Sequence, residues 1–212
     1  MSHMSEGNMV GSKSLVRRSN GLKAMLALPL LAGLLAGCGS KANNDTFDLS
    51  ASGIGNGPSQ RSHQILVPEP TALKALGSEQ VVVRVSPSEI QYLANSQWSD
   101  TLPRMVQSKL IEAYENSGKL AGVGKPGQGL AIDYQVVTDI RTFEISTSGQ
   151  KVANVEIFAK LLNDRNGSVK AQKVFSASVP VSGTTPDVFV KGMDRAFAQV
   201  SAAIVDWTLK AL

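Results

Sequence analysis

The chain has 212 residues, of which 42% are hydrophobic and 18% are charged, a composition typical of a globular protein that excludes disorder over most of the length. Most of the formal net charge of +4 resides in the first 37 residues, because residues 38–212 carry 17 basic and 16 acidic side chains. A near-neutral body has no electrostatic footprint for DNA or RNA, so we expect no nucleic-acid partner.

The first predicted element is a secretory signal over residues 1–37. Arg17 and Arg18 precede the uncharged run AMLALPLLAGLLAG, residues 24–37. This run is too short to cross a bilayer, for which about 20 residues are needed. A basic segment, a short apolar stretch and small residues at its end are typical of a signal peptide, whereas a buried core helix rarely follows an Arg pair in this way. Residues 1–12 are long for such a signal, and a start codon assigned too far upstream would explain them.

Cys38 is the only cysteine, so it has no disulfide partner within the chain. Residues 35–38 read LAGC and resemble the lipobox of bacterial lipoproteins, in which the thiol receives diacylglycerol and the chain is cut before the cysteine. With an N-acyl chain added, such an anchor holds a protein on a membrane, where a single acyl chain is marginal. The resemblance implies lipidation at Cys38, palmitate among the acyl chains, a location facing the periplasm, and no other cofactor. Gly39 in place of Asp favours the outer membrane.

Residues 38–63 are rich in Gly, Ser and Asn, which predicts a flexible tether before a folded domain over residues 64–212. Within the tether, residues 46–51 (TFDLSA) alternate apolar and polar side chains and could form an edge strand. Residues 63–70 (HQILVPEP) predict a strand that prolines end. Residues 80–87 (QVVVRVSP) predict a central strand, followed by an extended segment through Ile90 to Leu93.

Two helices are predicted, one in the middle of the chain and one at its end. For the first, Ser99 or Asp100 is a good N-cap, Pro103 falls in the first turn, and Gly118 ends the helix. The second begins at Thr185, with proline at its first helical position. Its apolar stripe is expected to pack on a sheet and comprises Phe189, Met193, Phe197, Val200, Ile204 and Trp207.

Between the helices, residues 129–146, 151–163 and 169–181 predict three long strands in a meander. The apolar face changes register along the first of these strands, so we expect a β-bulge near residues 137–139. Asn166-Gly167 suits the turn before the third strand. The resulting fold class is α+β, a twisted, mostly antiparallel sheet with two helices packed on one face.

The search for catalytic chemistry finds little. Asp133, Asp139 and Glu144 lie on one predicted strand, where acidic residues are usually solvated. The stretch GVGKPGQG, residues 122–129, lacks the phosphate-binding spacing and is expected to be a loop. Of the two histidines, only His63 follows the signal, which excludes a Cys/His zinc site by count. We expect His63 to be exposed and predict no catalytic residue, no metal site and no enzymatic activity.

Residues 66–118, which run from LVPEP to ENSG, resemble the ABC-type transport auxiliary lipoprotein family, the paraquat-inducible protein C-like group. The likeness lies in a strand, a segment with Tyr92 and Trp98, and an L-P-x-x-V-Q helix start at Leu102. Residues 131–145 and 155–167 also resemble the family, so the likeness spans roughly residues 45–210. It implies an α+β fold similar to the N-terminal domain of TolB. It also implies a non-catalytic subunit that works with a permease, an ATPase and an MCE-domain protein to move phospholipid or other hydrophobic molecules across the cell envelope.

Tyr92, Trp98 and Leu102 are the candidate residues for binding a partner or a lipid tail. Tyr and Trp serve well as interface anchors, but the same residues could cap the core between strand and helix, and the sequence leaves both interpretations open. The rival function is a structural outer-membrane lipoprotein that supports envelope integrity or secretion without transport. A homo-oligomer would suit a docking role, and no residue pattern specifies one.

Overall fold

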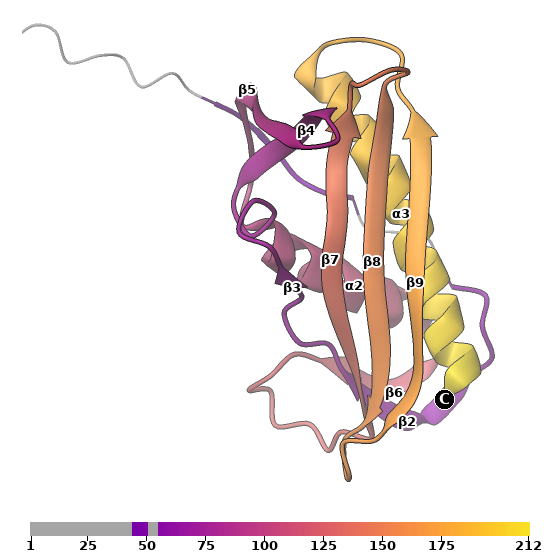
Figure 1. Cartoon of the computed structure of the whole chain (residues 1–212). Coiled ribbons are helices and arrows are strands. Elements are labelled where there is room, and N and C mark those ends of the chain that lie inside the picture. The colour runs from indigo at the N-terminus through magenta and orange to yellow at the C-terminus, as the bar shows by residue number, and fades with distance from the viewer. Residues whose placement is uncertain (1–43, 51–54) are drawn as a thin grey trace, which may run out of the picture. The chain divides into compact units, whose positions relative to one another are not determined.

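Three long strands lie side by side at the centre of the structure, a computed structural model that describes residues 44–50 and 55–212 (Figure 1). They are β7 (Tyr134–Ser146), β8 (Val152–Asn163) and β9 (Val169–Pro180), joined by two antiparallel ladders. Gly167 adopts a φ of 68° in the turn before β9, a left-handed conformation that glycine reaches without steric cost. The predicted meander and its turn are confirmed.

The second edge of β7 is shared by three short strands that follow one another in the chain. β2 (Gln60–Leu66) pairs with its beginning, β3 (Thr71–Ala72) with its middle and β4 (Gln80–Ser86) with its end, all in parallel. The sheet is completed by β5 (Glu89–Trp98), antiparallel to β4, by β1 (Asp45–Phe47) beyond β5, and by β6 (Leu120–Gly124) beyond β2. The long ladders are antiparallel, as the sequence predicts.

Strict alternation of side chains assigns one face of β8 to the core, since Val155, Ile157, Ala159 and Leu161 are buried and the residues that alternate with them are partly exposed. In β7 the buried positions change from even to odd numbers, which requires one extra residue. The predicted β-bulge is present, but the irregularity lies between Ile140 and Thr142, a few residues later than expected.

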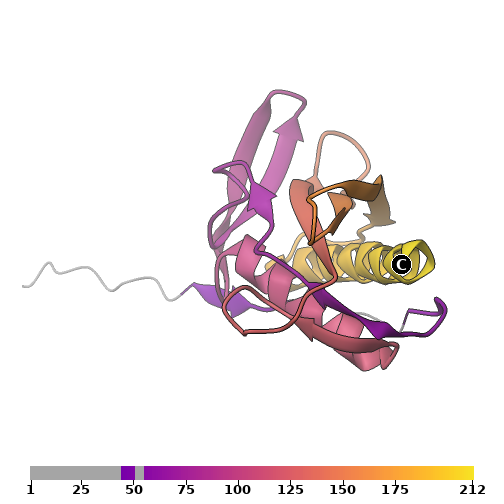
Figure 2. The same cartoon turned by 90° about the horizontal axis from the view of Figure 1, so that it is seen from below.

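Both predicted helices form and pack on the same face of the sheet. Helix α2 (Leu102–Ser117) begins after Thr101, one or two residues later than expected, and ends at Gly118, whose φ of 62° is left-handed. Helix α3 (Pro186–Ala211) has Thr185 as its N-cap, as predicted. Figure 2 shows both helices on one side of the sheet, with the hairpin of β4 and β5 projecting on the other.

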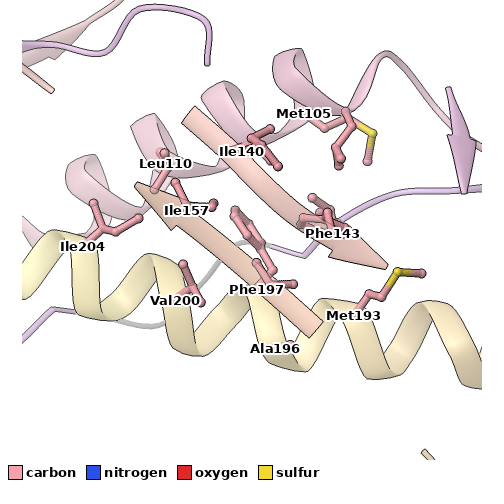
Figure 3. Close-up of a cluster of buried hydrophobic side chains, with 14 of the residues drawn as sticks. Met105, Leu110, Ile140, Phe143, Ile157, Met193, Ala196, Phe197, Val200 and Ile204 are labelled. Carbon is pink, nitrogen blue, oxygen red and sulfur yellow. The ribbon is translucent and has the colours of Figure 1, made fainter. Parts of the chain in front are cut away.

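The core lies between the helices and the inner face of β7–β9. Phe143 of β7 stands between Trp98 and Phe197, with ring centroids 5.8 and 5.9 Å away. Figure 3 shows side chains of α2, α3 and the two central strands meeting there: Met105, Leu110, Ile140, Phe143, Ile157, Met193, Ala196, Phe197, Val200 and Ile204. Fully burying one such aliphatic or aromatic side chain contributes about 1.5–3 kcal/mol. The α+β class with two helices on one face is confirmed.

Two segments that the sequence assigns to flexible regions belong to the sheet or the core. Leu49 is only 2% exposed, and Gly57 lies so close to α3 that a Cβ there would approach the Leu209 side chain to 2.6 Å. The described residues between 44 and 63 are therefore packed on the domain, because their small residues permit close contact with α3. Likewise, Gly122 and Gly124 lie in β6 and not in a loop.

Candidate partner-binding surface

The face of the sheet opposite to the helices is the candidate site. Residues paired directly across neighbouring strands have their side chains on the same face of the sheet. The register therefore places one row of side chains across β5, β4, β7, β8 and β9. We call this surface the open face, and it comprises Val82, Arg84, Tyr92, Arg141, Glu144, Asn154, Glu156, Phe158, Lys160, Val174 and Ser178. Across its row, Tyr92 of β5, Glu144 of β7 and Ser178 of β9 stand on the same side of the sheet.

An ion pair anchors the open face where the β4–β5 hairpin leaves the sheet. The Arg84 Nε donates to Glu144 Oε1 at 2.5 Å, and its Nη1 donates to the Pro87 carbonyl at 3.2 Å. The Glu144 side chain is 6% exposed, whereas that of Arg84 is 35% exposed. The hydrogen bond to Glu144 raises the pKa of Arg84. The pair therefore gives a carboxyl group in a desolvated position an ion partner.

Sequence reasoning expected Glu144 to be solvated, and this was wrong. Its partner lies 60 residues earlier in the chain, and β4 meets β7 in a parallel pairing that no local pattern specifies. Of the two other acidic residues, Asp139 accepts a hydrogen bond from the Thr71 hydroxyl at 2.8 Å. Asp133 accepts one from the backbone N–H of Gln64 at 3.0 Å. All three hold strands together.

Elsewhere on the open face, Phe158 of β8 is an apolar side chain surrounded by charged groups. The guanidinium of Arg141 lies 4.7 Å from the ring centroid and the ammonium of Lys160 lies 5.8 Å from it. Both distances suit cation–π attraction. Arg141 also lies 3.8 Å from Glu156, so the positive and negative groups are balanced around the ring. Such a surface can contact another protein through both apolar and charge-assisted interactions.

The structure separates the three residues predicted to bind a partner. Tyr92 is 45% exposed on the open face, where it can serve as an anchor. Trp98 and Leu102 are each 1% exposed and lie in the core, so the partner-binding prediction fails for them and the core-capping interpretation holds. Cys38, the predicted lipidation site, lies outside the described residues.

A bulge in β5 explains why Tyr92 and Trp98 point to opposite sides although they are six positions apart, an even offset that would place them on one face of a regular strand. Between Gln80 and Val82 of β4, the paired residue of β5 changes from Gln97 to Tyr92. Asn95 lies in this irregularity with a φ of 51°, the left-handed region that Asn tolerates better than most residues. The bulge reverses the face of the strand, so it exposes Tyr92 while Trp98 stays buried.

Two other surface features bring polar or charged side chains together. His63 is partly exposed and its Nδ1 lies 3.8 Å from Asp133, but the hollow around them is lined by Tyr134, Asn163 and Arg165 and offers no Ser, Thr or Cys nucleophile. A groove of about 670 Å³ runs beside α2, and there Arg104 lies 3.7 Å from both Glu69 and Asp100. These three charged groups pair with each other, and neither feature assembles a catalytic set.

A family model for the ABC-type transport auxiliary lipoprotein component matches residues 47–205. The chain belongs to this family. The matched range contains every strand and helix that forms the open face and its support, from the last residue of β1 to most of α3. The resemblance inferred from the sequence is confirmed.

Three other proteins are similar to the chain in sequence or in fold. An uncharacterised protein of Bradyrhizobium diazoefficiens is 30% identical over 189 residues, which cover 86% of this chain and 50% of the relative, so the chain spans half the length of that relative. The crystal structure of protein XCC0632 from Xanthomonas campestris matches with a TM-score of 0.74 at 29% identity, over 79% of this chain and 95% of that one. The hypothetical protein CT253 from Chlamydia trachomatis matches in fold alone, with a TM-score of 0.51, 12% identity, and coverage of 69% and 95%.

Two further observations apply to residues 44–50 and 55–212. Neither α2 nor α3 combines the length and the apolar character that a membrane-spanning helix needs. Within the same residues, no three His, Cys, Asp or Glu side chains are grouped closely enough to hold a metal ion.

Proposed function

We propose that this lipoprotein is the non-catalytic auxiliary subunit of an MCE-type ABC transport system that moves phospholipid or other hydrophobic molecules across the cell envelope. The family match over residues 47–205 carries the proposal, since the family is one of ABC-type transport auxiliary components. In such a system ATP is hydrolysed by a partner. The chain's part is to bind, and its described side chains present a surface for binding without a catalytic set.

The proposed division of labour is between an anchor and a surface. Acyl chains on Cys38 hold the domain at the periplasmic side of a membrane, in our proposal the outer one. The open face then contacts the MCE-domain protein or the permease, with Tyr92 as the anchor residue because it is large, amphipathic and 45% exposed. The ion pair of Arg84 and Glu144 fixes the hairpin that carries it.

A photo-crosslinking amino acid at position 92 of the full chain tests this proposal in intact envelopes. We expect an adduct with an MCE-domain protein or a permease subunit, identified by mass spectrometry. The matched control is the same amino acid at Lys191, an exposed position of α3 on the helix side of the sheet, which we expect to give no such adduct. Tyr92→Ala should reduce capture of the same partner without changing the melting temperature.

The same experiment separates the rival function. Adducts at position 92 that contain only envelope-integrity or secretion proteins, with no MCE or permease subunit in repeated captures, would overturn the transport proposal. They would support the structural outer-membrane role instead. Equal adducts at positions 92 and 191 would show that the open face is not the contact surface, even if the partner is the proposed one.

A further inference from the structure

Strand β9 has a free edge. Within the described residues it pairs with β8 alone, and it continues for twelve residues from Val169 to Pro180. The amide of Val181 donates to the Lys151 carbonyl at 3.0 Å, which sets the phase of the antiparallel ladder. Because hydrogen-bonded pairs alternate along such a ladder, odd-numbered residues of β9 bond to β8. The backbone N–H and C=O groups of even-numbered residues therefore point away from the sheet.

The outward-pointing positions are regular, and the even-numbered side chains from Gln172 to Ser178 are exposed. Gln172, Val174, Ser176 and Ser178 each offer an N–H and a C=O at the edge, in a stretch whose ladder to β8 has no irregularity. Pro180 ends the strand at a position where a missing N–H costs no internal hydrogen bond, which is the usual place for proline in an edge strand. Unpaired edges of this length are templates for adding another strand.

We propose that this edge pairs with the same edge of a second copy, in antiparallel register about a two-fold axis at Val174. In that register Val174 lies opposite Val174 of the second copy, and Gln172 lies opposite Ser176 of the second copy. Each residue in these pairs presents its free N–H and C=O to the other, so the edge is self-complementary. Val174 is 40% exposed, one of five exposed large apolar side chains in the described chain, and the pairing buries it.

Charge disfavours moving the axis to the preceding residue. Lys170 and Lys173 are the charged residues of β9, and both precede the axis. With Val174 at the axis, Lys173 faces Phe175 of the second copy, and its ammonium already lies 5.4 Å from the centroid of its own Phe175. Moving the axis to Lys173 would place two lysines directly opposite, which destabilises a strand pair. The lysines therefore disfavour the register centred on Lys173 and permit the proposed one.

The dimer joins two sheets into one and keeps both open faces on the same side, because the axis is perpendicular to the sheet. The two helix layers lie together on the other side. A partner would then meet a surface of doubled width with two copies of Tyr92. This interface does not depend on the transport function, so either proposal can fail without the other.

Cysteine substitution in the full chain tests the register. The Cα atoms of a hydrogen-bonded antiparallel pair lie about 5.5 Å apart, which suits a disulfide. We expect Val174→Cys to give a disulfide-linked dimer of twice the mass when envelopes are oxidised. The matched control is Val169→Cys, because Val169 is another exposed valine of the same strand. In the proposed register its two copies are about 30 Å apart, so it should stay monomeric. The unmodified chain, with Cys38 alone, measures the background.

A second variant measures association without cross-linking. Val174→Lys places two lysines at the axis, and we expect native mass spectrometry in detergent to show a monomer where the unmodified chain gives a dimer. Its melting temperature should equal that of a monomeric unmodified chain, because position 174 is exposed. A Val174→Cys chain that stays monomeric, equal cross-linking at position 169, an adduct with a different protein, or a dimer that survives Val174→Lys would each overturn the proposal.

Discussion

Arg84 is the ion partner of Glu144, whose side chain is only 6% exposed, so removing Arg84 has a measurable cost. In Arg84→Ala, Glu144 loses its ion partner while remaining nearly inaccessible to water. We expect the free energy of unfolding to fall by about 2 kcal/mol, at the lower end of the range for buried pairs because Arg84 itself is partly exposed. Urea denaturation measures the loss.

Two further variants isolate the cause. Adding Glu144→Gln to Arg84→Ala should recover at least half of the lost stability, since a neutral amide is less costly to bury than an unpaired carboxylate. Arg104→Ala is the matched control, because its ion pairs with Glu69 and Asp100 are exposed and should contribute less than about 1 kcal/mol. Equal losses from Arg84→Ala and Arg104→Ala would contradict the role given to Glu144.

A buried hydrogen bond joins the two helices. The Thr208 hydroxyl donates to the Ile204 carbonyl at 2.9 Å, so it must accept the proton of Tyr114, whose hydroxyl lies 2.7 Å away. We expect Tyr114→Phe to lower the free energy of unfolding by about 1–2 kcal/mol, because Thr208 loses its donor. Tyr92→Phe on the surface is the control, and thermal unfolding of both should show a change only for the buried residue.

Tyr114 also makes stability depend on alkaline pH. Burial raises the pKa of the Tyr114 phenol. The folded chain therefore retains this proton at a pH where the unfolded chain, with an ordinary tyrosine pKa of about 10, releases it. Stability is full below that pH and falls as the pH rises above it. Urea unfolding between pH 8 and 11 should show a steeper fall for the unmodified chain than for Tyr114→Phe, and parallel curves would contradict this account.

At the scale of elements, the bulge in β5 decides which side chains the hairpin exposes. Asn95 has a φ of 51°, where a β-branched side chain is strained. We expect Asn95→Val to destabilise the fold by about 1–2 kcal/mol and Asn95→Gly to leave it unchanged or slightly more stable. Chemical denaturation compares them. Equal stabilities would mean that the bulge does not require the left-handed conformation.

The elements themselves were largely predictable because each has a local signal. Alternation predicts β8, the proline at its first turn and the glycine after its end delimit α2, and Thr185 followed by Pro186 predicts the start of α3. The bulge in β7 was also expected, because the apolar positions change parity. The predicted position of the bulge differs from the observed one by a few residues. The pattern of apolar side chains shows that the register changes along the strand, but it does not show where the extra residue lies.

The site was less predictable, for reasons that are also physical. Tyr92, Trp98 and Leu102 looked alike as interface candidates, and only the bulge at Asn95 separates the first from the other two. A bulge without glycine or proline leaves almost no mark in a sequence. The ion pair of Arg84 with Glu144 depends on a parallel pairing between strands that are far apart in the sequence. The glycines before β2 resemble a linker in the sequence, but in the structure they permit close contact with α3.

For the whole molecule, the proposed function needs a location as well as a surface. The domain presents balanced charge on its open face, and its near-neutral body gives no general electrostatic attraction to an anionic membrane. In the proposed function, the lipid on Cys38 supplies the membrane association. The single cysteine at position 38 precedes the first described strand by only a few residues, so a lipid there would hold the domain close to the bilayer surface.

Cys38→Ser in the full chain tests this anchor. Without the thiol no diacylglycerol can be attached, and the step that cuts before the lipidated cysteine has no substrate. We expect the variant to keep its precursor mass, to incorporate no radiolabelled palmitate, and to leave the membrane fraction that contains the unmodified protein. Gly39→Ala, which alters the neighbouring residue and spares the thiol, is the control and should be processed normally. Because the substitution lies outside the described domain, the thermal unfolding of residues 44–212 within the chain should not change. Normal palmitate incorporation and membrane retention of Cys38→Ser would overturn the anchor and, with it, the location on which the transport proposal depends.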